Sequence, residues 1–473
     1  MEPIPGKVGQ IVGRHQRLPG GLWDLGNGLM PVGLQIRPHE AYFRCVYIVT
    51  LLHGLGMAGL ENSDSSPSVS AQQGWSSSLG FVLAAAGSAV GLGNLWGLTY
   101  RVALGGGMAF LVLYLVAVVV LGFPLLLAEL ALGRHTRRSP VLATVAVGGP
   151  SWRPLGWLFP LSSALILGYY AVITGWVGRA LLAVLQGRPP TDQAGAEAFF
   201  LKLSGGWAEG VAYGLVLALT AAVVATGVQQ GIERLSRWSM PALLVLLTGL
   251  LVWSAGLANA HARYEEMLLH WRWSDWLDPH ILRQAFSQAF FSLGLGSGAM
   301  LAYASHLGAR DPLPRQAAII TVLDTAVGLL AVLIIVPLIN TAAVGHHDGA
   351  GAVGTLFVAI PLGFASLGGA GPLLMAAFFF LASIAAVTSA VALLEVPVAV
   401  VMDRLGWGRA RTAWSTVAVV ALLGLPALLR TDLLMASHDL FGGVVLIGSG
   451  LLLSLLMGWV APQQLREDLS QLP

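Results

Sequence analysis

Charged residues and cysteine are both scarce in this chain of 473 residues. Only 10% of the residues are charged, whereas 56% are hydrophobic, and the mean hydropathy is +0.75. A soluble domain carries about a quarter charged residues, so this composition cannot cover a water-facing surface. The net charge of +2 gives no electrostatic case for nucleic acid. Cys45 is the only cysteine, which excludes a disulfide framework and a cysteine-based metal site.

Long apolar stretches are abundant instead. Each stretch long enough to cross about 30 Å of hydrocarbon must be helical, because lipid satisfies no backbone group. Ten membrane helices are predicted, at 77–99, 107–132, 157–186, 209–229, 238–258, 281–306, 315–341, 368–403, 409–429 and 434–460. The chain is therefore expected to be an all-α polytopic membrane protein.

Arginines in the short connections predict the orientation of these helices. They lie at 134–138, 234–237, 310–315 and 404–411, which fall on one side if the helices alternate. Basic residues in short loops mark the cytoplasm, so both termini are expected inside. The longer connections 187–208, 259–280 and 342–367 are then outside. Trp271, Trp273 and Trp276 in the second of these either seat a loop helix at the interface or form an aromatic belt.

The first 73 residues differ from the rest, because they are rich in glycine, proline and polar residues. Their best apolar run, Ala41–Leu60, is broken by Arg44 and His53, which is unlike a secretory signal. Residues 1–73 are either a disordered cytoplasmic tail or upstream sequence translated by misassignment, with Met57 as the true start. Residues 74–460 are expected to form the ten-helix core, and 461–473 a cytoplasmic tail.

Two predicted helices contain unusual clusters of glycine. The first reads GSAVGLGN at 87–94, and the sixth reads SLGLGSG at 292–298. Each glycine costs about 1 kcal/mol of helix stability relative to alanine, so both clusters favour an unwound stretch at mid-membrane. Glycine-interrupted segments in matching positions of two halves indicate a transporter's binding site. Close helix packing through small residues is the alternative, but it explains the matched placement less well.

Several polar side chains lie inside the apolar segments. The acids are Glu129, Asp324 and Glu395, and Thr388 and Ser389 occur together in the eighth helix. A buried acid costs roughly 2.5–3.5 kcal/mol at a helix centre and so needs a partner or a function. Oxygen ligands suit a small hard cation, and half-helix ends suit a cation and a carboxylate. Alternatively, Thr388 and Ser389 bond within their own helix, and Glu129 supports structure near the cytoplasmic end.

These motifs resemble the neurotransmitter:sodium symporter family in its bacterial amino-acid branch. The strongest stretch is Trp75–Trp96, and the supporting ones are GFPLLLAELALG at 122–133, GIER at 231–234, QAFFS at 288–292 and the Thr388–Glu395 segment. They are collinear and cover nearly all of 74–460. The resemblance implies the leucine-transporter-type fold, in which two inverted five-helix repeats with broken helices 1 and 6 surround a central site. It also implies the bacterial cytoplasmic membrane.

Two sodium sites are implied by this resemblance. One uses the Ala89 carbonyl, Asn94, Ser292, Asp324 and the substrate carboxylate. The other uses the carbonyls of Gly87, Val90 and Ala385 with the hydroxyls of Thr388 and Ser389. Chloride-dependent relatives place a serine one turn after the sodium-site asparagine, and the corresponding positions here are Gly328 and Asp324. Asp324 supplies a fixed negative charge, so transport is expected to be independent of chloride.

The resemblance also implies a substrate site around Tyr170, which matches the tyrosine that bonds the substrate carboxylate. The other residues expected there are Ser88, Ala89, Gly91, Leu92, Gly93, Ile166, Phe291, Ser292, Gly294, Ser297, Ser389 and Leu393. Gly91 stands where monoamine carriers have an aspartate, so the substrate must bring its own carboxylate. Gly294 and Ser297 are small, which predicts a large neutral, bulky or aromatic, amino acid.

The gates depart from the family pattern. The arginine of the outer gate is absent after Asn94, although Asp439 matches its partner. Arg101 is a candidate substitute, and the alternative for Asp439 is a surface carboxylate. On the inner side Trp75 and Asp403 match gate positions, but Gln72 and His306 replace the expected arginine and tyrosine.

We therefore expect sodium-coupled symport of a neutral amino acid, not an enzyme, with membrane lipid as the surrounding partner. The alternative is a transport-deficient sensor or scaffold that retains the fold. The oligomeric state, the amino acid and the sodium stoichiometry are left open by the sequence.

Overall fold

Apolar sequence forms helices throughout the computed structural model, which describes residues 74–269, 273–308, 311–338 and 351–461. No strand occurs in these four ranges. The chain divides into two units after Ser66, and the first unit, Met1–Ser66, lies outside the described residues. The expectations for residues 1–73, Gln72 among them, for Trp271 and Arg310, and for the tail beyond Ala461 likewise concern residues outside these ranges.

The predicted membrane helices correspond to helical segments that we number helix 1 to helix 10. The first half comprises helix 1 (α2, Ser78–Ala89; η1, Gly93–Gly97; α3, Leu98–Gly105), helix 2 (α4, Gly107–Ala117; η2, Val118–Gly122; α5, Phe123–Thr136), helix 3 (α7, Arg153–Leu185), helix 4 (α9, Trp207–Ala225) and helix 5 (η4, Val228–Glu233; α10, Arg234–Ala255). The second half comprises helix 6 (α12, Pro279–Ser292; α13, Ala299–Ala304), helix 7 (α14, Leu313–Ile335), helix 8 (α18, Gly371–Leu405), helix 9 (α19, Arg409–Leu429) and helix 10 (α20, Thr431–Ser437; η9, His438–Val445; α21, Leu446–Leu455; η10, Leu456–Val460).

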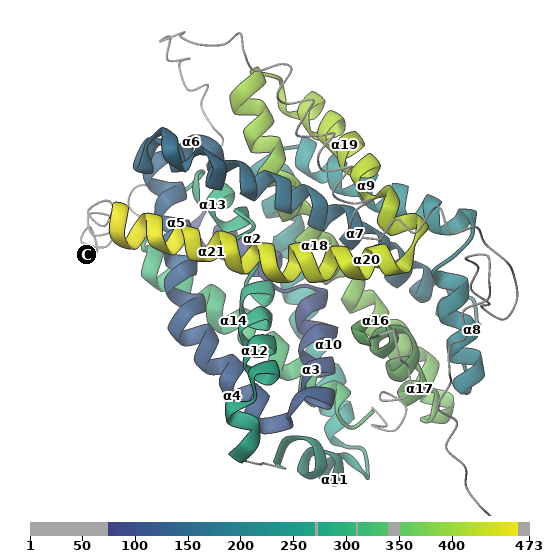
Figure 1. Ribbon diagram of the computed structural model, residues 1–473. Helices are drawn as coiled ribbons and strands as arrows, with labels where there is room; N and C mark the ends of the chain where they lie inside the picture. The colour runs from purple at the N-terminus through teal and green to yellow at the C-terminus, as the bar shows by residue number, and fades with distance from the viewer. Residues whose placement is uncertain (1–73, 270–272, 309–310, 339–350, 462–473) are drawn as a thin grey trace, which may run out of the picture. The chain divides into compact units, whose positions relative to one another are not determined.

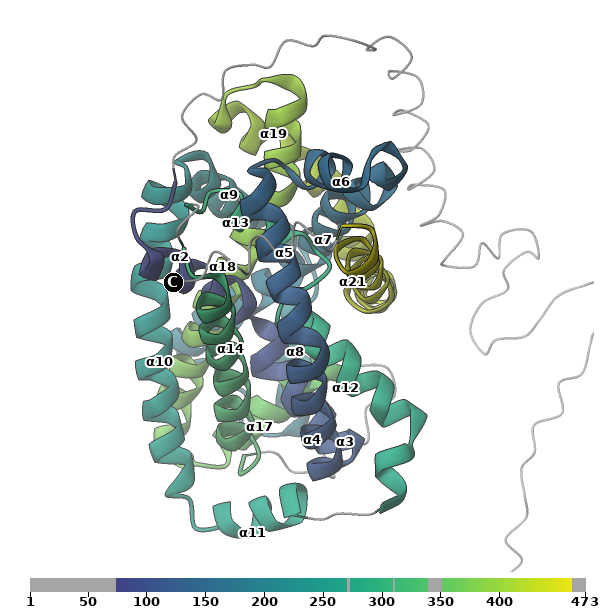
Figure 2. The same ribbon diagram turned by 90° about the vertical axis from the view of Figure 1, so that its left-hand side faces the viewer.

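Short helices occupy the connections. They are α6 (Pro140–Gly148), η3 (Pro150–Trp152), α8 (Gln193–Leu203), α11 (Ala260–Tyr264), η5 (Glu265–Leu269), η6 (Trp273–Leu277), α16 (Gly351–Gly354), η7 (Thr355–Ala359), α17 (Ile360–Ala365) and η8 (Gly368–Ala370). Figure 2 shows α11 lying across the end of α10. Trp273 and Trp276 belong to η6, where their rings lie 6.4 Å apart.

Eight segments of the described chain are long and apolar enough to cross a membrane. Helix 1 becomes a ninth when its two halves, which meet at an angle of 57°, are counted together. Helix 6 does not qualify by length, because its break leaves two short pieces. The ten-helix prediction therefore holds, and its two exceptions are the segments in which clustered glycine predicted a break.

Helices 3 and 8 form the centre of the bundle. The most extensive contact between helices joins α18 to α7, and α20 and α21 run beside α7 (Figure 1). Figure 2 shows α10 and α14 upright beside each other, in agreement with their mutual contacts. Large buried rings such as Trp176, Tyr169 and Phe378 fill the space between these helices.

Apolar side chains also cover the outer faces of the described helices. Val119, Leu215, Val245 and Leu422 are each between 65% and 71% exposed, in four different membrane helices. Such exposure would be unfavourable in water, whereas it is expected where a helix meets hydrocarbon. The protein is an integral membrane protein.

Two hydrogen bonds join the arginine-containing connections in pairs. Arg134 at the end of helix 2 donates to the Asp311 carbonyl before helix 7. Arg409 at the start of helix 9 donates to the Val224 carbonyl at the end of helix 4. These contacts agree with the expectation that the basic connections share one side of the membrane.

Candidate substrate and sodium site

Helix 1 is interrupted at the predicted position. α2 ends at Ala89, and Val90 leaves the helical conformation with ψ near 100°. The chain resumes a helical path at Gly93, after the turn is held by a hydrogen bond from the Gly91 amide to Asn94 Oδ1 at 3.1 Å. Asn94 therefore caps the break that its neighbouring glycines allow.

Helix 6 is interrupted by three glycines in the left-handed region. Gly294, Gly296 and Gly298 have φ of 65°, 75° and 78°, values that residues with a Cβ rarely adopt. The freed backbone groups bond to side chains of other helices: Ser163 and Ser449 donate to the carbonyls of Ser297 and Gly296 at 2.8 and 2.6 Å, and Glu129 Oε1 accepts from the Gly296 amide at 2.7 Å.

Three of the predicted ligands of the first sodium site converge between the two breaks. Asn94 Nδ2 lies 2.9 Å from Ser292 Oγ and 2.8 Å from Asp324 Oδ1, and Ser292 Oγ donates to Asp324 Oδ2 at 2.6 Å. All three side chains are at most 1% exposed. No basic side chain bonds to Asp324 within the described part of the chain, so its buried charge has neutral partners only.

The donor set of this cluster suits sodium. It offers carboxylate and hydroxyl oxygens, which are ligands that hard cations prefer, while the Asn94 amide oxygen accepts from the Gly91 amide beside it. A cation there would also compensate the buried carboxylate. Within the described residues no group of three histidine, cysteine or acidic side chains forms a transition-metal site.

The predicted second sodium site brings helix 8 against the break of helix 1. Ser389 Oγ donates to the Ser88 carbonyl at 3.0 Å and lies 3.5 Å from the Val90 carbonyl and 3.2 Å from the Ala385 carbonyl. Thr388 bonds to the Ala385 carbonyl of its own helix at 3.0 Å. Each of the two alternatives for this pair therefore applies to one residue. Thr388 hydrogen-bonds within its own helix, whereas Ser389 hydrogen-bonds to the break of helix 1. A Cβ on Gly87 would lie 3.3 Å from Met240 Sδ of helix 5.

A cavity of about 50 Å³ lies beside these clusters. Twelve of the thirteen residues expected around the substrate line it, and the remaining one, Ser292, lies in the adjoining Asp324 cluster. The lining residues are Ser88, Ala89, Gly91, Leu92, Gly93, Ile166, Tyr170, Phe291, Gly294, Ser297, Ser389 and Leu393, with Ala299 and Leu446 in addition.

Tyr170 and Gly91 define one wall of this cavity. The Tyr170 hydroxyl accepts from the Leu92 amide at 3.3 Å, at the open end of the helix break. A Cβ on Gly91 would lie 2.6 Å from Ser389 Oγ and 3.1 Å from the Tyr170 hydroxyl. Position 91 therefore has no room for an aspartate in this arrangement.

The inner gate residues make separate contacts. The Trp75 indole N–H donates to the Tyr303 carbonyl at 2.9 Å, and Asp403 accepts from the Ser139 amide at 2.9 Å. His306 Nε2 lies 3.8 Å from Glu395, which also pairs with Arg409. Trp75 thus ties the start of helix 1 to helix 6, and His306 faces helix 8.

At the outer gate the hydrogen-bond partner of Arg101 is a neutral side chain. Arg101 hydrogen-bonds to Gln288 of helix 6, and no ion pair of the described residues joins it to Asp439. Gln288 in turn donates to the Gly93 carbonyl at 3.0 Å. Gln288 is fully buried next to the break of helix 1 and offers the guanidinium a near acceptor, while Asp439 lies close enough for its charge to attract that of Arg101.

Sequence reasoning missed five residues of this region. Ala299 and Leu446 line the cavity, Gln288 binds Arg101, and Arg409 pairs with Glu395, while Ser163 bonds to the break of helix 6. Only Arg409 carried a signal, as a cation close in sequence to the end of a helix that contains a buried acid.

Comparison with known proteins decides the family. The model of the sodium:neurotransmitter symporter family matches residues 72–198 and 202–443. The chain belongs to this family. It is a sodium-dependent transporter and not an enzyme.

Relatives agree with this assignment. The uncharacterized sodium-dependent transporter YhdH of Bacillus subtilis is 34% identical over 371 residues, which are 78% of this chain and 81% of that protein. The sodium-dependent neutral amino acid transporter SLC6A17 of Mus musculus is 28% identical over 55% of this chain and 40% of its own length. The crystal structure of MhsT in complex with L-phenylalanine covers 85% of this symporter and 93% of MhsT, with 32% identity and a TM-score of 0.76.

Proposed function

We propose that this symporter uses the sodium gradient to carry a neutral amino acid with a bulky or aromatic side chain into the cell. The observation that carries the proposal is the cavity between the two helix breaks, bounded by Tyr170 and adjoining the Asn94–Ser292–Asp324 cluster. The substrate carboxylate would lie between the Tyr170 hydroxyl and a cation at the cluster, so that neither ligand binds fully without the other.

The substrate class rests on what the cavity wall lacks. Gly91 contributes no carboxylate, so a monoamine would leave its ammonium group without a partner, whereas an amino acid supplies both charges. SLC6A17 is named as a neutral amino acid transporter, and MhsT was crystallised with L-phenylalanine. The cavity of about 50 Å³ is smaller than a bulky side chain needs, so lining side chains would have to move aside on binding.

Two sodium ions and no chloride complete the proposal. The first ion would bind at Asn94, Ser292 and Asp324, and the second between Thr388, Ser389 and the carbonyls of Gly87, Val90 and Ala385. Asp324 provides the negative charge that an anion would otherwise supply. Gly328 has no side chain and therefore offers no hydroxyl there for chloride. The orientation we propose, with the basic connections and both termini in the cytoplasm, follows from the positive-inside rule. The division into an extension at 1–73, a core at 74–460 and a tail at 461–473 is part of the same proposal.

Uptake into proteoliposomes tests this function. A mixed pool of labelled amino acids is offered with an inward sodium gradient, and again with choline in place of sodium. We expect accumulation of large neutral amino acids only with sodium, and unchanged accumulation when gluconate replaces chloride. Preference for glycine or alanine would contradict the substrate class.

A transport-deficient sensor is the second candidate. The observation that favours it is the outer gate, where Arg101 bonds to Gln288 and no ion pair to Asp439 is present in the described chain. Sodium-dependent binding of an amino acid without sodium-driven accumulation in the same vesicles would decide for the sensor.

A further inference from the structure

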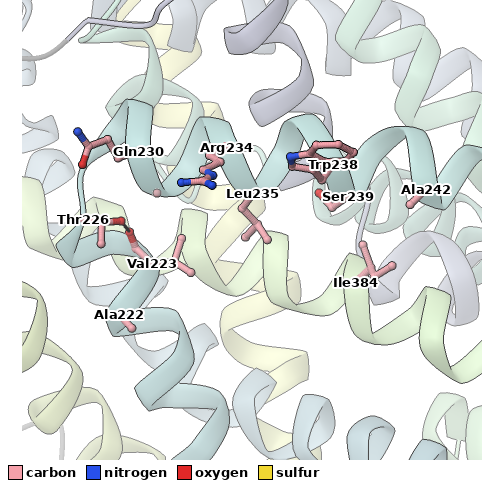
Figure 3. A pocket seen from close by; sticks show the side chains of 11 residues that line it. Ala222, Val223, Thr226, Gln230, Arg234, Leu235, Trp238, Ser239, Ala242 and Ile384 are labelled. Carbon is pink, nitrogen blue, oxygen red and sulfur yellow. Dashed lines mark hydrogen bonds between the residues drawn. The ribbon is translucent and has the colours of Figure 1, made fainter.

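A second cavity lies on the outer side of the bundle, away from the candidate substrate site. It is a groove of about 590 Å³ between helices 4, 5 and 8 (Figure 3). Its lining residues are Ala222, Val223, Thr226, Gln230, Gly231, Arg234, Leu235, Trp238, Ser239, Ala242 and Ile384. It shares none of them with the substrate cavity; the nearest link is the Thr388 hydroxyl, which bonds to the Ile384 carbonyl at 3.2 Å.

One part of this groove is apolar and lies within membrane-spanning segments. Ala222 and Val223 come from helix 4, Leu235 and Ala242 from α10, and Ile384 from α18. Figure 3 shows the α10 side chains along one wall and Ile384 on the facing helix. A groove with such walls at the lipid-facing surface of a membrane protein is suited to a hydrocarbon chain.

The other part is polar and lies where helices 4 and 5 end and begin. Thr226 and Gln230 belong to this turn, and Arg234 follows one turn into helix 5. The Arg234 side chain is exposed, and its guanidinium has no hydrogen bond or ion pair with another described residue. Trp238, one turn farther on, is 78% exposed. Tryptophan at a helix end marks the membrane–water interface, so Arg234 lies at the depth of lipid phosphates.

Neighbouring arginines differ from Arg234 in that their charges are compensated. Arg237 forms an ion pair with Glu233 at 2.7 Å, and Arg409 pairs with Glu395. Arg234 is therefore a cation at the mouth of an apolar groove without a described counterion. Basic pockets between membrane helices favour anionic lipid headgroups, and arginine matches the geometry of phosphate.

We propose that this groove binds one anionic phospholipid. An acyl chain lies along Leu235, Ala242 and Ile384, and the headgroup phosphate pairs with Arg234 while Trp238 lies at the interface. A zwitterionic lipid fits the same groove less well, because its own ammonium group competes for the phosphate.

Lipid adducts of the purified full chain in native mass spectrometry test the proposal. Delipidated protein is incubated with phosphatidylglycerol or with phosphatidylcholine of the same chain length. We expect retention of phosphatidylglycerol to be favoured about fivefold, the effect of one basic residue near the surface. Arg234→Gln should abolish that preference. Arg263→Gln, which removes a charge from α11 beyond the opposite end of α10, should leave it intact.

A second variant tests the acyl chain. Ala242→Phe fills the groove and should reduce retention of both lipids without changing their ratio. An unchanged preference in Arg234→Gln would overturn the proposal. So would displacement of the lipid by inorganic phosphate, because free phosphate cannot replace contacts made by an acyl chain.

Discussion

The Asp324 carboxylate of helix 7 lies 2.8 Å from the Asn94 amide nitrogen, directly after the break in helix 1. Ser292, the last residue of α12 before the break in helix 6, bonds to both. A change in the path of either broken helix must therefore alter the surroundings of one buried carboxylate. This relationship gives a physical route by which a cation could couple the two halves of the bundle.

Removing the charge of Asp324 should weaken sodium binding. In Asp324→Asn the side chain keeps its shape, but one carboxylate oxygen becomes an amide nitrogen and the fixed negative charge is lost, so we expect the sodium concentration for half-maximal uptake to rise about tenfold or more, an energy of ~1.4 kcal/mol. Asp432→Asn is the matched control, because Asp432 is exposed and pairs with Arg430. Equal sodium dependence in both variants would count against the assignment.

A methyl group at position 91 should block the substrate site. The Cβ of Gly91→Ala would approach Ser389 Oγ to 2.6 Å. We therefore expect the free energy of amino-acid binding to weaken by more than the free energy of unfolding falls. Gly214→Ala on helix 4 meets nothing within 4 Å and serves as the control. The measurement is equilibrium binding of labelled substrate at saturating sodium. Wild-type affinity in Gly91→Ala would show that the site lies elsewhere.

The break in helix 6 should depend on Gly296 more than on Gly294. Both have positive φ, which costs a residue with a Cβ about 1–2 kcal/mol. At Gly296 the Cβ would also lie 2.2 Å from the Leu446 carbonyl, whereas at Gly294 it meets nothing within 4 Å. Gly296→Ala should therefore lower the thermal midpoint further than Gly294→Ala. The reverse order would mean that the break does not pack against helix 10 in this way.

Removing only one partner of the ion pair between Glu395 and Arg409 should strongly lower the stability of the folded protein. Glu395 is 1% exposed and lies 3.8 Å from His306 at the inner gate. Glu395→Leu leaves the Arg409 charge without its partner, for which about 3–5 kcal/mol is typical of buried pairs. The double variant Glu395→Leu with Arg409→Leu should recover much of that loss. Thermal unfolding in detergent gives the comparison, and a double variant less stable than either single one would exclude the buried pair as the cause.

The two helix breaks could be predicted because their cause is local. Glycines at 87–93 and 294–298 weaken the helix wherever they stand, and three of them adopt the positive φ that only glycine tolerates readily. The convergence of Asn94, Ser292 and Asp324 could be expected only through the family resemblance, since 230 positions separate Asn94 from Asp324.

The site residues that the sequence did not indicate are brought to the site by contacts between distant helices. Leu446 lines the cavity because helix 10 runs beside helix 3, and nothing in its apolar surroundings marks it as a site residue. Arg101 was expected at the outer gate opposite Asp439, and the sequence did not indicate that its hydrogen-bond acceptor is the buried Gln288. A choice between two acceptors depends on the bend of helix 1, which composition does not determine.

The central claim is that sodium and the amino acid bind to one shared site between the two broken helices. Equilibrium binding of labelled substrate to the purified protein tests it most directly, with sodium replacing choline at constant ionic strength. We predict that the apparent Kd falls steeply with sodium, and that the substrate raises sodium affinity by the same factor, as linkage requires. In Asn94→Ala both effects should shrink together. An apparent Kd that does not change with sodium would contradict the account.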